Sequence, residues 1–483
     1  MMNRIDETRP TSAGIAPSFL LARFDRLPTM RLHYVWAALL ALNMMLEYYD
    51  NAIFAYASPT IKAHTGMSTE QIGFISSAFY VGMVIGALVG GWLSDRWGRR
   101  PVLVWGTVMY SLGVVATAFV PGYELILGSR FITGLGVQAA TSVLLVYVSE
   151  MFPSGARGRF LSVVTMGLTA AAVLAAALAM FYLPTGGPDT WRHLFLAGGI
   201  GLLIAPLVHF CLPESVRWCV ARGQVDRAEK IVSRLEARAL RQGPLATPQV
   251  SAVPYAAAQP TLRDLFQNRS VLRNLAVLFV SYFGVYLAYY TWANWSIYAL
   301  VYDLKYAQKD AYFILFIWTV VYGAMPFLAM RFLDRWERKN TILFMSVFAA
   351  LTLAALGMST GYWAVSIIGG ILTVFAGFVL NAYYTYIPET MPTQLRALGN
   401  GIVMSGARVG GAVSGVMGAA LVSAGGLKYV TWTAAAIYIV FAIPVLLFGP
   451  RTTNRSLEAV ADEELGRGQG EAPPPLASSR AAA

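Results

Sequence analysis

Long apolar runs alternate with short polar segments along almost the whole chain. Each run is close to 20 residues, the length that an α-helix needs to cross the hydrocarbon core of a bilayer. The twelve predicted spans are 34–57, 72–93, 102–120, 125–148, 160–183, 193–212, 274–300, 311–330, 341–358, 362–386, 398–422 and 429–449. The pattern predicts an all-α integral membrane protein with six transmembrane helices on each side of a central polar stretch.

The polar segments divide the chain into five predicted parts. They are an amino-terminal arm (1–33), a first helical bundle (34–212), a central loop (213–270), a second helical bundle (271–449) and a carboxy-terminal tail (450–483). In the central loop, apolar positions at helical spacing predict a surface helix from Asp226 to Leu240. The Ala-, Pro- and Gln-rich stretch 242–260 predicts a flexible linker, and the composition of the tail predicts disorder.

Composition and charge agree with a membrane protein. Hydrophobic residues make up 57% of the 483 positions and charged residues only 13%, and the mean hydropathy is +0.56. Of the 36 Lys and Arg, 29 fall in the arm, the central loop, the tail and the alternate short loops, which predicts a cytoplasmic location for both termini. The net charge of +11 therefore reflects topology, and we expect no nucleic-acid partner.

Two motifs occur twice, and both pairs of copies are separated by 239 positions. Asp95–Arg100 is repeated at Asp334–Lys339, and Glu150–Arg157 is repeated at Glu389–Arg396. Two unrelated motifs with one common separation indicate a tandem duplication, and therefore two pseudo-symmetric six-helix bundles. Internal repeats of this kind are typical of secondary transporters.

Two motifs resemble those of a known family. Gly91-x-x-x-Asp95-Arg96-x-Gly98-Arg99-Arg100 resembles the loop signature between helices two and three of the major facilitator superfamily. Pro213-Glu214-Ser215-x-Arg217-Trp218 is similar to a signature of its sugar porters, organic-ion transporters and aromatic-acid symporters. The resemblance implies that the loop cluster closes the cytoplasmic side when the transporter faces outward. The expected gating residues are Gly91, Asp95, Arg96, Gly98, Arg99, Arg100, Glu150, Arg157, Asp334, Arg335, Arg338, Glu389 and Arg396.

The residue types of this loop also have local reasons. Gly91 permits close approach of a neighbouring helix, and Gly98 tolerates the positive φ of a tight reversal. Asp95 lies at the end of a helix, where the dipole disfavours an anion, so we expect it to have a cationic or helix-terminal partner. The second copy has Met330 and Glu337 in place of the two glycines, which predicts a looser or different latch. The alternative is that the motif serves only topology and turn formation.

The first span carries two carboxylates, Glu47 and Asp50, on one helical face. An ionised carboxylate inside a membrane is costly without a cavity or a partner, so we expect both to be functional. The pattern resembles the first helix of metabolite/proton and aromatic-acid/proton symporters, although the latter usually have Gly where this chain has Tyr48. Arg130 begins an Arg-x-x-x-Gly-x-Gly pattern that is similar to a second signature of the superfamily, and it is the expected partner. We predict proton coupling through Glu47, Asp50 and Arg130; the alternatives are a structural ion pair and an Arg130 that reaches the outer interface.

A substrate site is predicted mainly in the second half. Arg408 lies too deep in its span to reach either interface, and its guanidinium offers two donors to a carboxylate. The 239-residue offset places Tyr286 and Tyr289 at positions equivalent to Glu47 and Asp50. The predicted substrate-binding residues are Arg408, Tyr282, Tyr286, Tyr289, Tyr290, Asn294, Gln138, Asn381 and Tyr384. Alternatively, Arg408 pairs with a buried acid, and the residues from Trp292 to Tyr298 form an aromatic belt at the outer interface.

Together these features predict a proton-coupled symporter that works by alternating access. It takes up a small organic anion, which we expect to be a carboxylate, either aromatic or aliphatic. A sugar or polyol porter and a non-transporting membrane sensor are the alternatives. No phosphate-binding loop suggests ATP as the energy source, and the fifth span lacks the Gly-Pro-rich signature of drug/proton antiporters. We expect no enzymatic activity, no metal and no cofactor besides the proton. We also expect a monomer in the lipid bilayer of a bacterial inner membrane.

Overall fold

The described chain is built from helices, and the first half supplies six membrane crossings. The computed structural model describes residues 16–153, 155–184, 187, 189–249, 269–332, 336–391 and 395–452. The first five crossings are α2 (Arg31–Thr65), α3 (Thr69–Trp97), α4 (Arg99–Phe119), α5 (Tyr123–Met151) and α6 (Arg157–Tyr182). The sixth is interrupted at Gly199 and Ile200 and consists of α7 (Thr190–Gly198) and α8 (Gly201–Cys211).

The second half supplies the other six crossings. They are α12 (Arg269–Tyr302), α13 (Gln308–Phe332), α14 (Arg338–Leu356), α15 (Tyr362–Glu389) and α16 (Arg396–Phe448), which contains two crossings. Non-helical φ/ψ angles at Gly425 and Gly426 divide α16. Gly426 has a φ of +62°, and Asp303 caps the following helix by accepting a hydrogen bond from Leu427 N at 2.7 Å. The predicted twelve-helix architecture is therefore confirmed.

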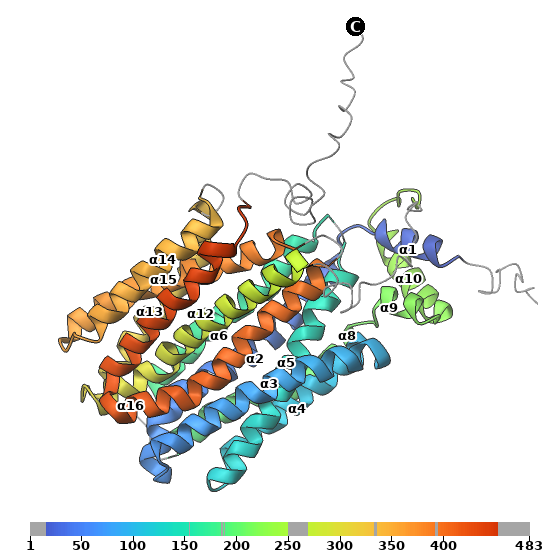
Figure 1. The fold of residues 1–483 in the computed structure, drawn as a ribbon. Helices are drawn as coiled ribbons and strands as arrows, with labels where there is room; N and C mark the ends of the chain where they lie inside the picture. The colour runs from blue at the N-terminus through green and yellow to red at the C-terminus, as the bar shows by residue number, and fades with distance from the viewer. Residues whose placement is uncertain are drawn as a thin grey trace, which may run out of the picture.

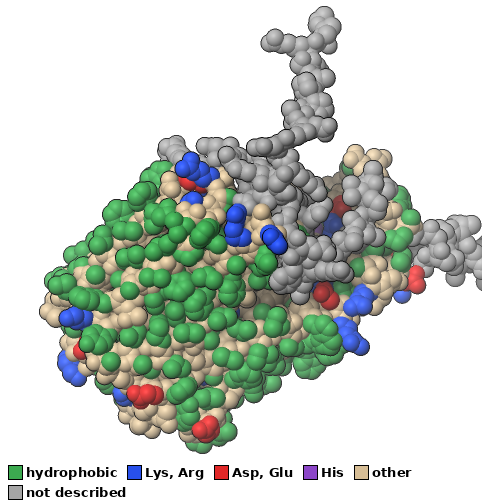
Figure 2. Space-filling model, viewed as in Figure 1, with side chains coloured by type: hydrophobic (Ala, Val, Ile, Leu, Met, Phe, Trp, Pro, Cys, Tyr) green, Lys and Arg blue, Asp and Glu red, His purple; other side chains and the backbone are tan. Residues whose placement is uncertain are grey.

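Apolar length supports the same count. Within the described residues, nine helices are long and apolar enough to cross a membrane, and α16 is one of them. Counting α16 twice and adding α2 and α13 gives twelve crossings. Most helices begin a few residues before the predicted spans; α2, for example, begins three residues before its span and also ends eight residues after it. Figure 2 shows the matching surface, a broad hydrophobic band with charged side chains gathered at the two ends.

Three short helices lie at one end of the molecule (Figure 1). The predicted surface helix is present as α10 (Val225–Ala239), and α1 (Pro17–Asp25) and α9 (Val216–Ala221) were not expected from the sequence. Most of the predicted linker and nearly all of the predicted tail lie outside the described residues. We call this end the Asp95 end, because α3 also ends there, and the opposite end the Lys62 end.

The helix α1 is held on α10 by charge. Arg23 bonds to Glu229 at 2.8 Å and to Glu236 at 2.5 Å, and Arg26 bonds to Glu236 at 2.6 Å. Burial acts to raise the pKa of Glu236, but the hydrogen bonds from Arg23 and Arg26 outweigh it and leave that pKa below its ordinary value. The arm is thus docked through Glu236, which both arginines share, and through Glu229.

The two halves meet mainly through α3 and α16, α6 and α13, and α2 and α12. Where α3 crosses α16, a Cβ on Gly73 would lie 2.7 Å from Gly415 O, so the backbones touch. Ser77 Oγ donates to Ala412 O in the same crossing at 2.5 Å. Small residues at such a crossing are the usual device for close helix packing in membranes.

At the Lys62 end, polar contacts also hold the two halves together. Lys62 Nζ donates to the hydroxyl of Tyr298 and to Thr69 Oγ1, and Tyr302 OH donates to Pro59 O at 3.0 Å. All of these except the bond from Lys62 to Thr69 join one half to the other. The ion pairs described at the Asp95 end join residues within one half, for example Arg99 to Glu150. The structure is therefore a conformation sealed at the Lys62 end.

Candidate functional site

An ion pair between Asp50 of α2 and Arg130 of α5 lies inside the first half. Nη1 of Arg130 is 2.7 Å from both carboxylate oxygens, and the two side chains are 0% and 1% exposed. The guanidinium also faces the rings of Phe79 and Phe54, with its carbon 4.5 and 5.1 Å from the ring centroids. Arg130 is thus a fully buried partner of Asp50, and the alternative in which it reaches the interface is wrong.

Glu47 is buried nearby with different partners. Its Oε1 accepts a hydrogen bond from Asn43 Nδ2 at 2.7 Å, and its Oε2 lies 2.6 Å from Thr141 Oγ1. The sequence predicts Glu47 and Asp50 on one face of a helix, and in the structure the two carboxylates have different partners. Asp50 has a cation, whereas the hydrogen-bond partners of Glu47 among the described residues are neutral.

A cavity lies between the halves. The second half contributes Tyr289, Tyr290 and Asn294, three of the predicted substrate-binding residues, together with Trp292, Trp318 and Tyr322. The first half contributes Tyr48, Asn51 and Tyr56. Trp292, Trp295 and Tyr298 are 5%, 2% and 2% exposed, so the alternative of an aromatic belt is wrong for these three. The cavity wall is aromatic with a few polar tips, as in many small-molecule sites.

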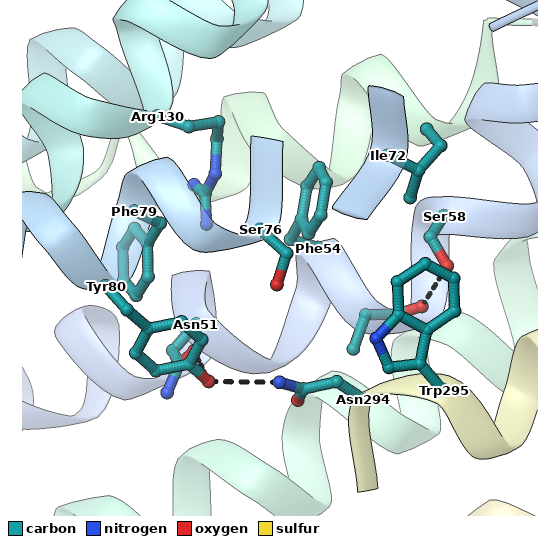
Figure 3. Close-up of a pocket in the computed structure, with 11 residues that line it drawn as sticks. Asn51, Phe54, Ser58, Ile72, Ser76, Phe79, Tyr80, Arg130, Asn294 and Trp295 are labelled. Carbon is teal, nitrogen blue, oxygen red and sulfur yellow. Dashed lines mark hydrogen bonds between the residues drawn. The ribbon is translucent and has the colours of Figure 1, made fainter. Parts of the chain in front are cut away.

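A second, smaller cavity adjoins the first on the side of the Lys62 end and shares Asn51, Ala55 and Asn294 with it. Figure 3 shows Tyr80 between the two halves, where its hydroxyl accepts a hydrogen bond from Asn294 of α12 at 3.2 Å. The same hydroxyl donates to Asn51 of α2 at 3.2 Å, and the ring packs on Tyr290 at 4.9 Å. Tyr80 therefore connects the halves between the two cavities.

Arg408 of α16 makes another connection between the halves, at a position different from that of Tyr80. Its Nε donates to Gln138 Oε1 of α5 at 3.0 Å, and its charge lies among the phenols of Tyr282, Tyr286, Tyr290 and Tyr384. Among the residues that the structure describes, it has no carboxylate partner, so the predicted alternative of a pairing with a buried acid is not seen.

The remaining predicted substrate residues surround this position without lining either cavity. The hydroxyls of Tyr286 and Tyr384 are hydrogen-bonded at 2.9 Å, and the ring of Tyr282 packs at a tilt against that of Tyr286 with centroids 4.7 Å apart. Asn381 turns back to its own helix, where it donates to Gly377 O at 2.8 Å. Arg408 and Gln138 are likewise absent from both walls. The predicted set is thus divided between a cavity wall and a tyrosine cluster around Arg408.

The loop signature at the Asp95 end forms a connected polar cluster. Arg99 pairs with Asp95 at 2.6 Å and with Glu150 at 3.0 Å, which gives Asp95 the cationic partner expected for it. Glu214 caps α4 by accepting from the backbone N of Arg99 and Arg100 at 2.8 and 3.2 Å. Gly98 has a φ of +110°, and a Cβ there would lie 2.3 Å from Glu214 Oε2. Only glycine fits this turn.

The other predicted gating residues are less connected. Arg96 lies 5.5 Å above the ring of Trp92, and Arg157 and Arg396 begin α6 and α16. A Cβ on Gly91 would meet nothing within 4 Å, so the close approach predicted for that glycine is absent in this conformation.

The second copy of the signature is built differently. Arg338 pairs with Glu389 at 3.3 Å, and Asp334 and Arg335 lie outside the described residues. Glu337 accepts from the backbone N of Thr452 at 3.2 Å, while Thr452 Oγ1 donates to Glu389 at 2.6 Å. A glutamate thus anchors the segment after the last crossing of each half: Glu214 belongs to that segment in the first half, and Glu337 binds to it in the second.

Several residues of the site were missed in the sequence, and the repeat offset contains a signal for some of them. The offset of 239 pairs Asn43 with Tyr282 and Asn51 with Tyr290, so these two asparagines match tyrosines, as Glu47 and Asp50 do. Applied to Tyr80, it gives Thr319, which also lines the larger cavity. Thr141 has no polar counterpart, because the offset leads to Leu380.

Comparisons with known proteins agree on one kind of molecule. A family model described as "Sugar (and other) transporter" matches residues 36–463. The chain is 28% identical over 444 residues to the niacin transporter NiaP of Acinetobacter baylyi, which covers 91% of this chain and 99% of that protein. It is 26% identical over 441 residues to the 4-hydroxybenzoate transporter PcaK of Pseudomonas putida, with 89% and 94% covered. The partially occluded inward open structure of the xylose transporter XylE from E. coli has the same fold, with a TM-score of 0.68, 19% identity, and 86% and 99% of the chains covered.

Proposed function

This chain belongs to the sugar (and other) transporter family of the major facilitator superfamily, and from that premise we propose that it takes up a small organic acid together with protons. It is an integral, multi-pass membrane protein, and the relatives it matches are transporters. The proposed substrates are planar aromatic carboxylates of the size of niacin or 4-hydroxybenzoate. The coupling ion is the proton, with no metal or cofactor.

The observation that carries the proposal is the bonding of Arg408. Its guanidinium lies inside the helix bundle, and its one hydrogen bond to the described residues goes to a neutral amide, Gln138. A cation held inside a membrane protein without an anion favours a ligand that supplies one. A carboxylate can take two parallel hydrogen bonds from a guanidinium, and these charge-assisted bonds are stronger than those to a neutral acceptor.

The neighbouring cavity suits the rest of such a molecule. The rings of Tyr289, Tyr290 and Trp292 offer faces and edges for a flat aromatic ring. Trp292 Nε1 is buried and has no acceptor among the described residues. A buried donor without a partner is costly, so an oxygen or nitrogen of the ligand is a natural acceptor for it.

Orientation and energy source belong to the same proposal. The Lys and Arg of the loops favour a cytoplasmic Asp95 end, in which case the described conformation opens toward the cytoplasm. The buried carboxylates Glu47 and Asp50 are candidates for the proton that accompanies the substrate. Because both halves of the site come from one chain, the monomer is the proposed transporting unit, and a bacterial inner membrane is the proposed location.

A sugar or polyol is the second candidate substrate. It is favoured by the wall of the larger cavity, which contains amides, hydroxyls and aromatic rings but no charged residue among those described. The two candidates differ in their need for Arg408, because a neutral ligand accepts weaker hydrogen bonds and does not neutralise the charge of the guanidinium.

Uptake into proteoliposomes tests the proposal. Radiolabelled niacin and 4-hydroxybenzoate should accumulate when the outside is more acidic than the inside, and a protonophore should abolish the accumulation. Xylose at the same concentration should stay at the level of empty liposomes. Xylose uptake without aromatic-acid uptake would favour the sugar porter, and aromatic-acid uptake that ignores the gradient would contradict symport.

A further inference from the structure

Glu47 occupies a site whose hydrogen bonds are fixed on one side. Asn43 accepts a hydrogen bond on its Oδ1 from the Tyr110 hydroxyl at 3.2 Å. Thr107 Oγ1 lies 3.0 Å from the same oxygen, but its proton can go instead to Leu103 O at 2.8 Å. With Oδ1 facing Tyr110, the amide NH₂ of Asn43 points toward Glu47 Oε1 at 2.7 Å. Glu47 itself is 2% exposed. One carboxylate oxygen is thus held by a donor that the Tyr110 hydroxyl orients.

The other oxygen of Glu47 faces a hydroxyl with a choice of partners. Thr141 Oγ1 is 2.6 Å from Glu47 Oε2 and 2.9 Å from Val137 O. A hydroxyl has one proton, so it donates to only one of these oxygens at a time. If Glu47 is ionised, Thr141 donates to it. If Glu47 is protonated, Glu47 donates to Thr141 Oγ1 and Thr141 donates to Val137 O. Both states of the carboxyl are therefore fully hydrogen-bonded without any movement of heavy atoms.

The charges around the two acids are unequal. Arg130 of α5 is paired with Asp50. Asp50 follows Glu47 on α2 by one helical turn. The groups that face Glu47 from the elements packed against it are Tyr110 of α4, Thr141 of α5 and Asn43 of its own helix. In the described residues none of these carries a positive charge. Asp50 would leave a buried guanidinium uncompensated on taking a proton, whereas Glu47 has no such cation to abandon.

Thr141 also lies on the route to the substrate position. It is only partly buried, whereas Glu47 is almost completely so. On α5 it follows Gln138 by one helical turn toward the Asp95 end, and Gln138 accepts the hydrogen bond from Arg408. The hydroxyl of Thr141 is thus the contact between the Glu47 carboxyl and the side of α5 that faces the other half.

We propose that Glu47, rather than Asp50, carries the coupled proton, and that Thr141 is the positioning residue that accommodates both of its charge states. The proposal rests on the proposed function and specifies its proton site. The proton binds to Glu47 Oε2 in exchange with water that reaches Thr141 and leaves by the same route, while the Asp50–Arg130 pair stays ionised.

Transport in proteoliposomes separates this inference from the proposed function. Wild-type protein that ignores the proton gradient would contradict the proposed function itself. If the wild type responds, Glu47→Gln should lose gradient-driven accumulation of 4-hydroxybenzoate but keep substrate exchange within about threefold. Glu124→Gln, at an exposed carboxylate of α5, is the matched control and should behave as wild type. Accumulation that survives in Glu47→Gln would overturn the inference and leave symport standing.

Thr141 has its own readout. Thr141→Val removes a hydrogen bond that is stronger to the ionised carboxylate than to the neutral acid, so the pH midpoint of exchange should move upward by about one unit. Thr141→Ser should restore the wild-type midpoint. An unchanged midpoint in Thr141→Val would overturn the role of Thr141.

An infrared titration covers variants that fold but do not transport. The C=O stretch of a buried protonated carboxyl should titrate in the wild type and be missing in Glu47→Gln. A band that persists in Glu47→Gln would place the proton on another group and overturn the inference.

Discussion

Arg408 of the second half donates a hydrogen bond to Gln138 of the first across 3.0 Å. This bond places the deepest cation of the second half on a neutral partner at the interface between the bundles. Gln138 uses only the Nε donor, so a carboxylate at Nη1 and Nη2, as proposed for the substrate, would share one guanidinium with the contact between the halves.

Arg408→Lys should weaken 4-hydroxybenzoate binding at least tenfold, which corresponds to ~1.4 kcal/mol, because an ammonium lacks the paired donors of a guanidinium. Substrate-induced thermal stabilisation measures the affinity. Gln138→Ala is the matched change on the other side of the bond and should keep binding within about threefold, because Gln138 occupies only the Nε donor of Arg408. Equal affinities in the wild type and Arg408→Lys would move anion recognition away from α16.

Asp50→Asn should lower stability by about 3–5 kcal/mol, because it leaves the buried guanidinium of Arg130 without a counter-ion. The double variant with Arg130→Met should recover much of that loss, since an apolar side chain of similar length replaces the charge. Thermal unfolding in detergent compares the two. If the double variant is no more stable than Asp50→Asn, the ion pair is not the reason for the loss.

Tyr80→Phe should make the Lys62 end open more often. The change removes the hydroxyl that joins Asn51 to Asn294. Only the bond to Asn294 crosses between the halves, and its loss at about 1 kcal/mol should raise the population of molecules open at the Lys62 end roughly fivefold. The measurement is the labelling rate of Ser76→Cys, in the smaller cavity, by an impermeant maleimide after Cys211 and Cys219 are replaced by serine. Tyr123→Phe, at the start of α5, serves as control and should leave the rate unchanged. A rate in Tyr80→Phe equal to that of the control would exclude Tyr80 from closure.

The two glycines of the loop signature should respond differently to alanine. Gly98→Ala introduces a side chain at φ +110° and against Glu214, so it should cost about 1–3 kcal/mol of stability. Gly91→Ala has open space and should leave stability unchanged in this conformation. If Gly91 packs closely when the Asp95 end shuts, the same variant should still slow substrate exchange. Normal exchange in Gly91→Ala would contradict a gating role for this glycine.

Docking of α1 should depend on pH through Glu236. Because the pKa of this carboxyl is lowered in the docked state by Arg23 and Arg26, its contribution is complete above its ordinary pKa near 4.5 and is lost as the pH falls below that value. The protection factors of the amide hydrogens in residues 17–25, which correct for the pH dependence of intrinsic exchange, should therefore be high at pH 7 and fall as the pH drops below about 4.5. Glu236→Gln should lower them at pH 7; unchanged protection in this variant would mean that the Arg23–Glu229 pair or apolar contacts hold the helix.

The sequence contains the elements of the site but not their pairing. The spacing of Glu47 and Asp50 predicts a shared helical face, and Arg130 is an evident cation for one of them. The choice between them depends on how α2 rotates against α5, which is set by packing between distant segments. In the same way, the run from Trp292 to Tyr298 has the composition of an interface belt, and only the position of α12 between α2 and α16 shows that its rings are buried.

Other features were beyond local patterns for other reasons. The nine residues of α1 are too few to predict a helix, and α1 is stabilised by contacts with α10 more than 200 positions away. Thr141 is an ordinary threonine in an apolar helix. Its importance comes from a carboxylate that lies 94 positions earlier in the chain.

The crossing of α3 and α16 bears on how easily the molecule can change state. Gly73, Ser77 and Gly415 meet mainly through backbone atoms, so their separation uncovers little apolar side-chain area and strips no charge of its counter-ion. Separating two helices at a crossing of this kind therefore costs little free energy. Such a crossing lets two arrangements differ by only a few kcal/mol, so a ligand of ordinary affinity can drive the chain from one to the other and back.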